Sequence, residues 1–410
     1  MYKLEDFLVV VLGFLFFVSC SSTNVDMEEE IEEEAIEEKD SVDQDTIVVF
    51  SNHKITNGMT FSEINTVLKS ASYGDTIAVE PGTYVITGEL AIKNGITIHK
   101  ESSVTPIFTA YDTSTTEMLE QYWSSNNRDI DIYGIQFRNI RINIRNASNT
   151  SFRYCIFDYG RRKAGTTKTY TQDAYIQMYN CDDMLVKGNV FKRRLGNSGR
   201  GIYTVDCVDT GIANNTFGNS GAEGYFVTAI NDNSDGTSIS GNTISRNESW
   251  VDFDETDHGI YVHSFNDVII ENNTISGWPA AGEGGAIKIR NGDGALIQNN
   301  TMTTSGILMY VYVSTAAHPY LKNIEIINNT ISVANSPNDI YHGIGYWRNT
   351  TSSGFYEESI LISGNNLSAG TLKITSPVDA TLFNSNNGGV YNNSIGTIYL
   401  ASGINNSNNY

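Results

Sequence analysis

The sequence predicts an all-β fold, a right-handed single-stranded parallel β-helix with an N-terminal capping helix. A short block recurs: apolar and β-branched residues, then Gly or Asn, then Asn, then Thr, Val, Leu or Ser, and last an apolar residue. Repeats of roughly 20–50 residues indicate a stack of similar coils. Only six prolines are present, so little interrupts strand pairing. The block ends at Phe157, Phe191, Phe217, Ile244, Ile275, Met302, Ile331, Leu367 and Ile395.

Asparagine is the most informative residue of the block. It tolerates the left-handed backbone conformation that tight turns need. Stacked asparagine amides can also hydrogen-bond in ladders from one coil to the next. Each coil is then expected to place its strands about 4.8 Å from the equivalent strands of the next coil.

A helix is predicted before the first coil. Thr60-Phe-Ser-Glu63 is a capping box, which marks a helix start. Four apolar residues that follow share one helical face: Ile64, Val67, Leu68 and Ala71. We expect this helix to cover the open end of the solenoid and prevent edge-to-edge association.

The N-terminus predicts export. The apolar run in residues 7–18 is too short to span a membrane comfortably and indicates a signal peptide of residues 1–19. Cys20 directly after the run resembles a bacterial lipoprotein processing site, which implies a lipid on Cys20 and anchoring to the outer membrane, facing the periplasm or the cell surface. Ordinary cleavage near Ser21 is the alternative.

An acidic tether of residues 20–46 is predicted next. Twelve Asp and Glu residues against one Lys make it self-repelling and supply 11 of the 21 net negative charges. The catalytic β-helix is expected to span 47–410. The exported chain carries no nucleic-acid-binding motif, and we expect a monomer that contacts the membrane only through its lipid.

Three cysteines lie in the predicted β-helix. Cys181 and Cys207 each follow an equivalent isoleucine by five residues, so they are expected to stack in one interior column. Together with Cys155, they show no spacing typical of a zinc site, and buried free thiols are favoured over a disulfide.

The stretch from 257 to 290 carries the strongest functional signal. It contains two copies of one pattern, at 258–263 and 285–290. The copies superpose in three pairs: Ile260 on Ile287, Tyr261 on Lys288, and His263 on Arg290. Alternation along neighbouring strands sends both isoleucines inward and the other four side chains to one outward patch.

Earlier coils extend the two outward columns. Gln177 and Tyr203 fall in the column of Lys288, whereas Tyr179 and Val205 fall in that of Arg290. Basic residues precede these coils: Arg161, Arg162, Lys163, Lys168, Lys192, Arg193, Arg194 and Arg200. A local cluster of one sign attracts anions, although a solvated basic face is the alternative.

These residue types match β-elimination at a uronic acid, which removes the C5 proton and expels the oxygen at C4. The reaction needs a group that neutralises the carboxylate, a base and an acid. The catalytic candidates are Lys288, Tyr261, Arg290, His263 and His258. The substrate-binding candidates are Arg200, Tyr203, Tyr179, Arg194 and Trp347. Cationic neighbours are expected to depress the pKa of Lys288.

Acidic residues before each copy offer a second constellation. Asp254, Asp257 and Glu283 are candidate Ca²⁺ ligands, although their spacing matches no closed calcium loop. Carboxylates of the same loop could instead form a glycoside-hydrolase pair. No other cofactor is expected.

A short motif carries a family resemblance. Glu283-Gly-Gly-Ala-Ile-Lys-Ile-Arg-Asn291, leading to Gln298-Asn-Asn-Thr301, resembles β-helix polysaccharide lyases of the alginate lyase and chondroitinase B type. The resemblance implies a carbon–oxygen lyase with a lysine base and a later arginine that assists. Gln298 occupies the later arginine position, and the lysine position aligns better with Arg290 than with Lys288. The Lys/Tyr pairing looks like other β-helix alginate lyases.

Several outcomes follow from the same C5 deprotonation. A glycosidic leaving oxygen gives a lyase acting on an anionic, algal-type polysaccharide or oligosaccharide such as alginate or ulvan. A free hydroxyl at a non-reducing end gives a dehydratase, and return of the proton to the opposite face gives a C5-epimerase. A non-catalytic surface glycan-binding lipoprotein and a structural adhesin or spike are the alternatives of another class. The insertion with Tyr346-Trp-Arg348 is expected to stack on a terminal sugar.

Overall fold

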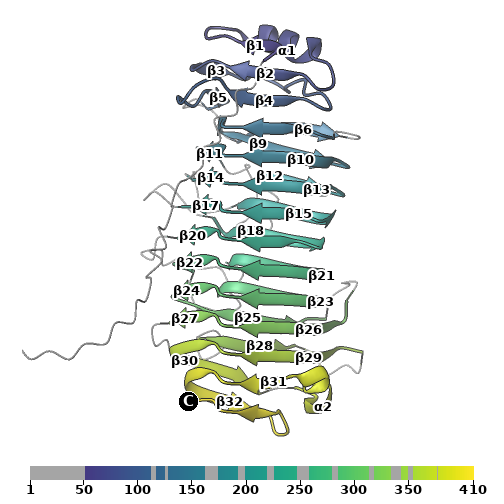
Figure 1. Cartoon of the computed structure of the whole chain (residues 1–410), viewed down its shortest axis with the longest axis vertical. Helices are drawn as coiled ribbons and strands as arrows, with labels where there is room; N and C mark the ends of the chain where they lie inside the picture. Colours follow the sequence, from purple (N-terminus) through teal and green to yellow (C-terminus); the bar gives the residue numbers. More distant parts are fainter. Residues whose placement is uncertain are drawn as a thin grey trace, which may run out of the picture. The chain divides into compact units, whose positions relative to one another are not determined.

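The protein is a stack of parallel β-coils in its computed structural model (Figure 1). The structure describes residues 51–111, 117–124, 128–161, 174–192, 199–218, 226–246, 258–278, 285–313, 318–333, 343–349, 354–375 and 377–410. These residues belong to one compact unit, 49–410. The predicted signal peptide, Cys20 and the acidic tether lie outside the described residues.

Each coil contributes to as many as three parallel ladders, which we call faces A, B and C. Face A contains β6 (Leu119–Ser124), β9 (Ile140–Arg145), β12 (Ala174–Tyr179), β15 (Arg200–Val208), β18 (Thr228–Asp235), β21 (His258–Glu271), β23 (Gly285–Gln298), β25 (Ile307–Val311), β28 (Ile344–Arg348), β30 (Asn366–Ile374) and β32 (Ser394–Leu400).

Faces B and C complete the coils. Face B contains β1 (His53–Ile55), β2 (Thr76–Val79), β4 (Thr97–Lys100), β7 (Asp131–Tyr133), β10 (Ser148–Arg153), β13 (Asp182–Lys187), β16 (Gly211–Ala213), β19 (Ser238–Ser240), the second halves of β21 and β23, β26 (Tyr320–Ile327), β29 (Tyr356–Ser363), β31 (Gly389–Tyr391) and β33 (Asn406–Ser407). Face C contains β3 (Thr83–Val85), β5 (Ile107–Thr109), β8 (Gln136–Arg138), β11 (Ile156–Asp158), β14 (Val190–Phe191), β17 (Thr216–Phe217), β20 (Thr243–Ser245), β22 (Thr274–Ser276), β24 (Thr301–Thr303), β27 (Thr330–Ser332) and the first residues of β30 and β32.

The interior is filled by columns of like residues. The isoleucine column of face A is fully buried and contains Ile142, Ile176, Ile202, Ile230, Ile260, Ile287, Ile307 and Ile344. Phe157, Phe191 and Phe217 stack on face C at centroid distances of 4.9 and 4.7 Å. Burying such columns removes apolar surface from water in every coil, which is the main force holding the stack together.

An asparagine ladder runs through the stack beside face C. Each side-chain Nδ2 and each backbone N–H donates to Oδ1 of the next asparagine, at 2.9–3.0 Å. The ladder contains Asn189, Asn215, Asn242, Asn273, Asn300, Asn329, Asn365, Asn393 and Asn409. The predicted amide ladder is confirmed.

The residue before each ladder asparagine makes the turn. It has a positive φ between 54° and 68° in every coil of the ladder. These residues are Gly188, Asn214, Gly241, Asn272, Asn299, Asn328, Gly364, Asn392 and Asn408. Only Gly and Asn occur here, because both tolerate the left-handed region. The two adjacent positions of the block therefore have different physical roles.

Helix α1 (Phe61–Ser70) lies at the N-terminal end of the stack (Figure 1). Thr60 and Glu63 form the predicted capping box. Ile64 and Leu68 are buried in the main core. Its proposed action as a cover against association stays a prediction. At the other end lie the short helix α2 (Ala380–Phe383) and a 3₁₀ turn, Ser385–Asn387.

The described cysteines are buried free thiols, as predicted. Cys181 and Cys207 directly precede the paired residues Asp182 and Val208, so they lie in one interior column. Burial raises the pKa of the Cys155 thiol to about 12, which makes it a packing residue and not a nucleophile.

One carboxyl group lies inside the stack. Asp232 faces inward from β18, accepts hydrogen bonds from Thr204 and Thr237, and keeps Oδ2 without a partner. Burial outweighs these bonds and raises the pKa of Asp232 to about 6. Asp232 was not singled out from the sequence; its neighbours in the same column are Thr204 in the preceding coil and Val262 in the next.

We predict that the two asparagines of one block respond oppositely to substitution. Asn273→Ala removes the acceptor of two donors on Asn242, removes the side-chain donor to Ile239 O, and leaves Asn300 Oδ1 with only the backbone N–H of residue 273. The expected loss is about 3 kcal/mol or more in urea unfolding. Asn272→Gly, at an exposed turn position with φ 55°, should change stability by about 1 kcal/mol or less. Equal losses would contradict the assignment of roles.

We also predict that Asp232→Asn stabilises the protein at high pH. Because the folded-state pKa is raised, the stability contributed by protonated Asp232 is lost as pH rises through 6. The cost of the charged form is about 3 kcal/mol at pH 8. Urea unfolding at pH 4 and pH 8 should show a smaller pH dependence in the variant. Asp206→Asn, an exposed residue on β15, is the matched control; identical pH dependence in Asp232→Asn and wild type would refute the assignment.

Candidate functional site

Strand register brings the predicted outward patch together on face A. Tyr261 pairs with Lys288, and His263 with Arg290, between β21 and β23. Ile260 and Ile287 are buried in the core and face inward, as alternation requires.

The outward side chains of face A form two columns along the stack, which we call column 1 and column 2. Column 1 contains Tyr122, Asn143, Gln177, Tyr203, Asn231, Tyr261, Lys288 and Leu308. Column 2 contains Arg145, Tyr179, Val205 and Asn233 in the earlier coils and His263, Arg290, Tyr310 and Trp347 in the later ones; Asn233 and His263 directly follow the paired residues Asp232 and Val262.

A corner of each coil places His258 beside these columns. A Cβ on Gly259 would lie 2.7 Å from Ala286 O and 2.8 Å from Ile275 Cγ2. Only a glycine lets the backbone approach the next coil this closely. His258 precedes this glycine at the start of β21, and its ring centroid lies 4.9 Å from that of Tyr261.

Cations surround the ring of Tyr261. Lys288 Nζ and the Arg290 guanidinium carbon each lie 5.6 Å from its centroid, and the His263 ring lies 4.9 Å away. Lys288 is only 3% exposed, and its Nζ also lies 4.5 Å from the ring centroid of Tyr310. The Tyr261 ring is thus held between basic groups. Its hydroxyl group is placed to exchange a proton with an anionic ligand bound beside it.

Both histidines are neutral at physiological pH. Burial, followed by the charges of Arg290, Arg200 and Lys288, lowers the pKa of His263 to about 3. Burial and the same lysine and Arg290 lower the pKa of His258 well below 6.5. Nδ1 of each ring is buried and has no hydrogen-bond partner. Two neutral imidazoles therefore keep a ring nitrogen available for a ligand.

The predicted binding residues lie next to the patch along the stack. The guanidinium of Arg200 lies 4.4 Å from the ring centroid of Tyr203, and Tyr179 meets Tyr203 edge-on at 5.9 Å. Burial lowers the pKa of Arg200, which stays a cation. Burial raises the pKa of Tyr179. These tyrosines and the arginine offer flat surfaces and positive charge on one face.

Aromatic residues close the other side of the patch. Leu308 and Tyr310 are 1% exposed and form a small apolar cluster with Tyr312 and Trp347. Tyr310 and Trp347 lie 5.1 Å apart between ring centroids. The Arg290 guanidinium carbon lies 5.6 Å from the Tyr312 ring. Face A is therefore polar before Lys288 and apolar in the coil directly after it.

The prediction that the Tyr346-Trp-Arg348 insertion stacks on a sugar is wrong for two of its three residues. Tyr346 faces inward, as alternation requires, and donates a hydrogen bond to buried Glu357. Arg348 Nη1 pairs with the same carboxylate at 3.3 Å. Only Trp347 faces the site.

Some predicted site residues cannot be placed. Arg194, Asp254, Asp257 and Glu283 lie outside the described residues, as does Cys20. The candidate Ca²⁺ site, the carboxylate pair and most of the basic loop cluster therefore stay predictions.

Sequence reasoning did not single out Asn143, Arg145 and Asn231 for the face. Asn143 Oδ1, Gln177 Nε2 and Asn231 Oδ1 are buried polar atoms without partners, like the Nε atoms of Arg145 and Arg290. The register would have found them, since extending columns 1 and 2 by single coils reaches each one. These five atoms without partners thus lie on the same columns as the catalytic candidates.

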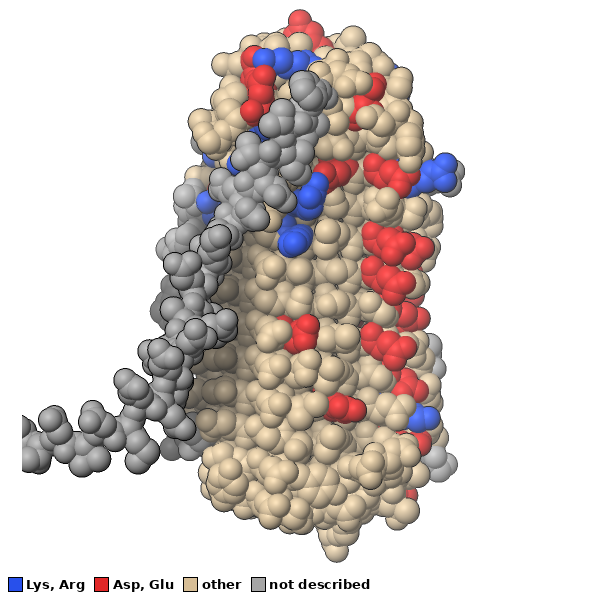
Figure 2. Space-filling model, viewed as in Figure 1, with Lys and Arg blue, Asp and Glu red and all other residues tan. Residues whose placement is uncertain are grey.

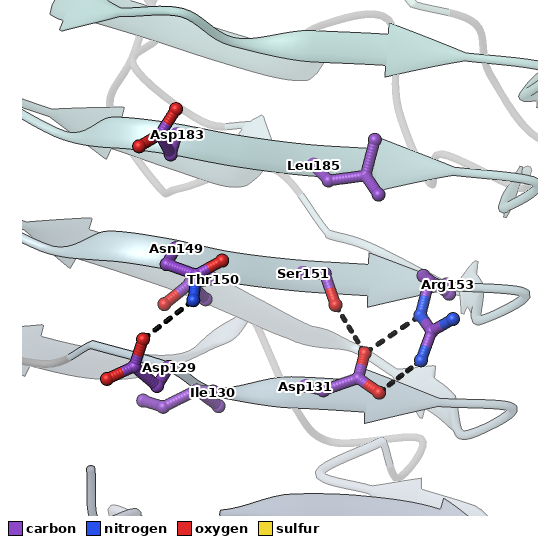
Figure 3. Close-up of a pocket in the computed structure, with 9 residues that line it drawn as sticks. All are labelled: Asp129, Ile130, Asp131, Asn149, Thr150, Ser151, Arg153, Asp183 and Leu185. Carbon is purple, nitrogen blue, oxygen red and sulfur yellow. Dashed lines mark hydrogen bonds and ion pairs between the residues drawn. The ribbon is translucent and has the colours of Figure 1, made fainter. Parts of the chain in front are cut away.

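A pocket of about 350 Å³ lies elsewhere, on face B across β7, β10 and β13 (Figure 3). Two of its carboxylates have partners within the protein: Asp131 pairs with Arg153, and Asp129 accepts a hydrogen bond from Asn149. Exposed Asp182, Asp183 and Asp209 cluster nearby, and acidic side chains form a stripe along one edge of the stack (Figure 2). We assign no chemistry to this pocket.

Known proteins share the fold. Residues 142–282 match the family model described as right handed beta helix region, which confirms the predicted handedness. No curated protein sequence matches the chain. The described residues include no helix long and apolar enough to cross a membrane.

Solved structures show the same architecture at low identity. The Streptococcus pneumoniae surface protein and adhesin PfbA is 14% identical, with a TM-score of 0.53 over 87% of this chain and 98% of its own. The catalytic domain of a GH87 α-1,3-glucanase in complex with nigerose is 13% identical, with a TM-score of 0.54 over 87% and 68%. A PL6 alginate lyase in complex with a trisaccharide is 14% identical, with a TM-score of 0.49 over 86% and 85%. The TM-scores of the adhesin and the glucanase indicate a common fold, and a common fold does not define the reaction.

We predict that His263→Gln reduces the acid sensitivity of the fold. The folded-state pKa is about 3, so as pH falls below 6.5 the unfolded chain binds a proton that the folded protein does not. Between pH 8 and pH 5 the wild type should lose about 2 kcal/mol more stability than the variant in urea unfolding. His99→Gln, half-buried on face B, is the control. A variant that loses as much stability as the wild type would show that His263 titrates normally.

Proposed function

We propose that the protein catalyses β-elimination at C4–C5 of a uronic-acid residue in an anionic polysaccharide or oligosaccharide, such as alginate or ulvan. The observation that carries the proposal is the convergence of Tyr261, Lys288 and Arg290 with two neutral histidines on one buried patch. Such a patch binds a carboxylate and provides groups for proton transfer beside it.

Each group has a role in the reaction. Arg290 binds the substrate carboxylate, and neutral His258 or His263 adds a hydrogen bond through its unpartnered nitrogen. Together they stabilise the negative charge that develops when the C5 proton leaves. Lys288 and Tyr261 are the proton-transfer pair: one takes the C5 proton, and the other protonates the leaving oxygen. The C5–H electron pair forms the C4–C5 double bond as the C4–O bond breaks, so no oxidant or reductant is needed.

Hydrolysis is supported less well. A glycosidase needs two carboxyl groups that flank one bond. Among the described residues of columns 1 and 2, from β12 to β28, none is Asp or Glu. The basic and aromatic character of these columns favours elimination.

A dehydratase is the second candidate. The apolar cluster of Leu308, Tyr310, Tyr312 and Trp347 borders Lys288 on one side only. Such a boundary suits a chain end, where elimination would expel water from the C4 hydroxyl of a non-reducing-end uronate. The residues and proton transfers are the same; only the leaving group differs. Return of the proton at C5 would instead give an epimerase.

The cellular setting is part of the proposal. A lipid on Cys20 would hold the protein at the outer membrane, and residues 20–46 would act as a tether. We propose a monomer that needs no cofactor, with Ca²⁺ at Asp254, Asp257 and Glu283 as the alternative that chelation with EDTA tests.

Absorbance near 235 nm tests the reaction, because a C4–C5 unsaturated uronate absorbs there. The protein lacking residues 1–46 is incubated with alginate, ulvan, chondroitin and pectate, as polymers and oligosaccharides, with and without EDTA. Lys288→Ala and Tyr261→Phe should each lower the rate by about 100-fold or more. Lys187→Ala, a half-buried lysine on face B, should leave it unchanged.

Mass spectrometry of the products distinguishes the leaving groups. Chain cleavage identifies a lyase, and loss of one water from an intact oligosaccharide identifies a dehydratase. No absorbance change on any uronate would overturn elimination. Binding without turnover would then favour a non-catalytic surface glycan-binding protein.

A further inference from the structure

Arg145 and Arg290 occupy the same column in closely similar surroundings. The guanidinium carbon of Arg145 lies 4.5 Å from the ring centroid of Tyr179 and 5.7 Å from that of Tyr122. The guanidinium carbon of Arg290 likewise lies 5.6 Å from each of two tyrosine rings. Both arginines have a buried Nε without a partner. Within the described residues neither forms an ion pair.

Two other arginines of the stack are neutralised by a carboxylate. Arg141, four residues before Arg145, pairs with Glu120 at 2.9 Å. Arg153, on face B, also lies over a tyrosine ring but pairs with Asp131. A guanidinium held between rings and left without a counter-ion retains donors for a planar anion such as a carboxylate. Arg145 is therefore equipped as a binding residue.

The surface between the two arginines is also incomplete without a ligand. They are five strand spacings apart, from β9 to β23, which is about 24 Å. In the adjacent column, Asn143, Gln177 and Asn231 are 6%, 2% and 2% exposed. Each amide keeps one buried polar atom without a partner. Unsatisfied buried polar groups are costly, and sugar hydroxyls could satisfy all three.

Tyrosines alternate with the last two of these amides. Tyr203 and Tyr261 alternate with Gln177 and Asn231 in column 1. Aromatic rings provide flat apolar surface for sugar rings, and amides fix their hydroxyl groups. Repetition of this pattern from coil to coil suits a ligand that is itself a repeating chain.

We propose that face A holds an extended uronate chain along the stack, from a distal carboxylate subsite at Arg145, Tyr122 and Tyr179 to the reacting residue at Arg290. The proposal rests on the proposed function for the identity of its ligand. It adds that the substrate is a chain of several uronates. Most of this chain would lie over the coils that precede Lys288, from β9 to β21. The apolar cluster after Lys288 leaves the shorter part of the ligand on that side.

The test compares ligand lengths. Uronate disaccharides and long oligosaccharides of alginate and pectate are titrated calorimetrically into wild type, Arg145→Lys and Tyr122→Ala, and KM is measured at 235 nm. Arg145→Lys keeps the charge but loses the planar fork, and Tyr122→Ala truncates a 40% exposed ring. Each should weaken binding and raise KM for long chains by about tenfold, with kcat and disaccharide binding unchanged.

Tyr154→Ala is the matched control, because Tyr154 is a 48% exposed tyrosine on the turn after β10 of face B. It should leave both affinities unchanged. Equal effects of Arg145→Lys on long and short ligands, or none on either, would overturn the distal subsite. So would failure of the wild type to bind any uronate chain. If the wild type binds long chains through Arg145 but never produces absorbance, the subsite stands and elimination fails.

Discussion

The asparagine ladder fixes the register on which the rest of the protein depends. Each amide joins one coil to the next through two hydrogen bonds to a single buried oxygen. A slip of one residue would turn the interior column outward and break the ladder in the same step. Strand pairing alone tolerates such slips, whereas a buried polar ladder does not. The coils are therefore aligned at the ladder position from Asn189 to Asn409, although the pairing of face A shifts in register near Val205, Asp232 and Leu367.

Fixed register turns a linear pattern into a surface. Residues that lie 27 positions apart, such as Tyr261 and Lys288, become neighbours about 4.8 Å apart. A long chemical surface thus needs no loop to position its side chains. The charge of the site follows from this geometry, since burial and the converging charges of Arg290, Arg200 and Lys288 lower the pKa of His263 and keep it neutral. Rigid strands also suit the preorganised charges that elimination requires.

The fold and the central pairs of the site were predictable from the sequence. The block spacing indicated the coils, and superposing 258–263 on 285–290 gave the observed register. Burial was not predictable: alternation shows that Lys288 faces outward, but not that it is 3% exposed. The inward carboxyl of Asp232 and the inward phenol of Tyr346 were missed because they share one column, and the residues between them in that column are apolar. Arg145 was missed because the outward columns were extended only as far as the coil of Gln177 and Tyr179.

The measurement that tests the central claim most directly is a crystal structure of the Lys288→Ala variant with a bound uronate oligosaccharide. The account predicts a sugar chain along face A, with the carboxylate of one uronate bound to Arg290. The C5 hydrogen of that uronate is predicted to point between Tyr261 and position 288. A ligand bound across β7, β10 and β13 on face B, or one whose carboxylates avoid Arg290, would contradict it.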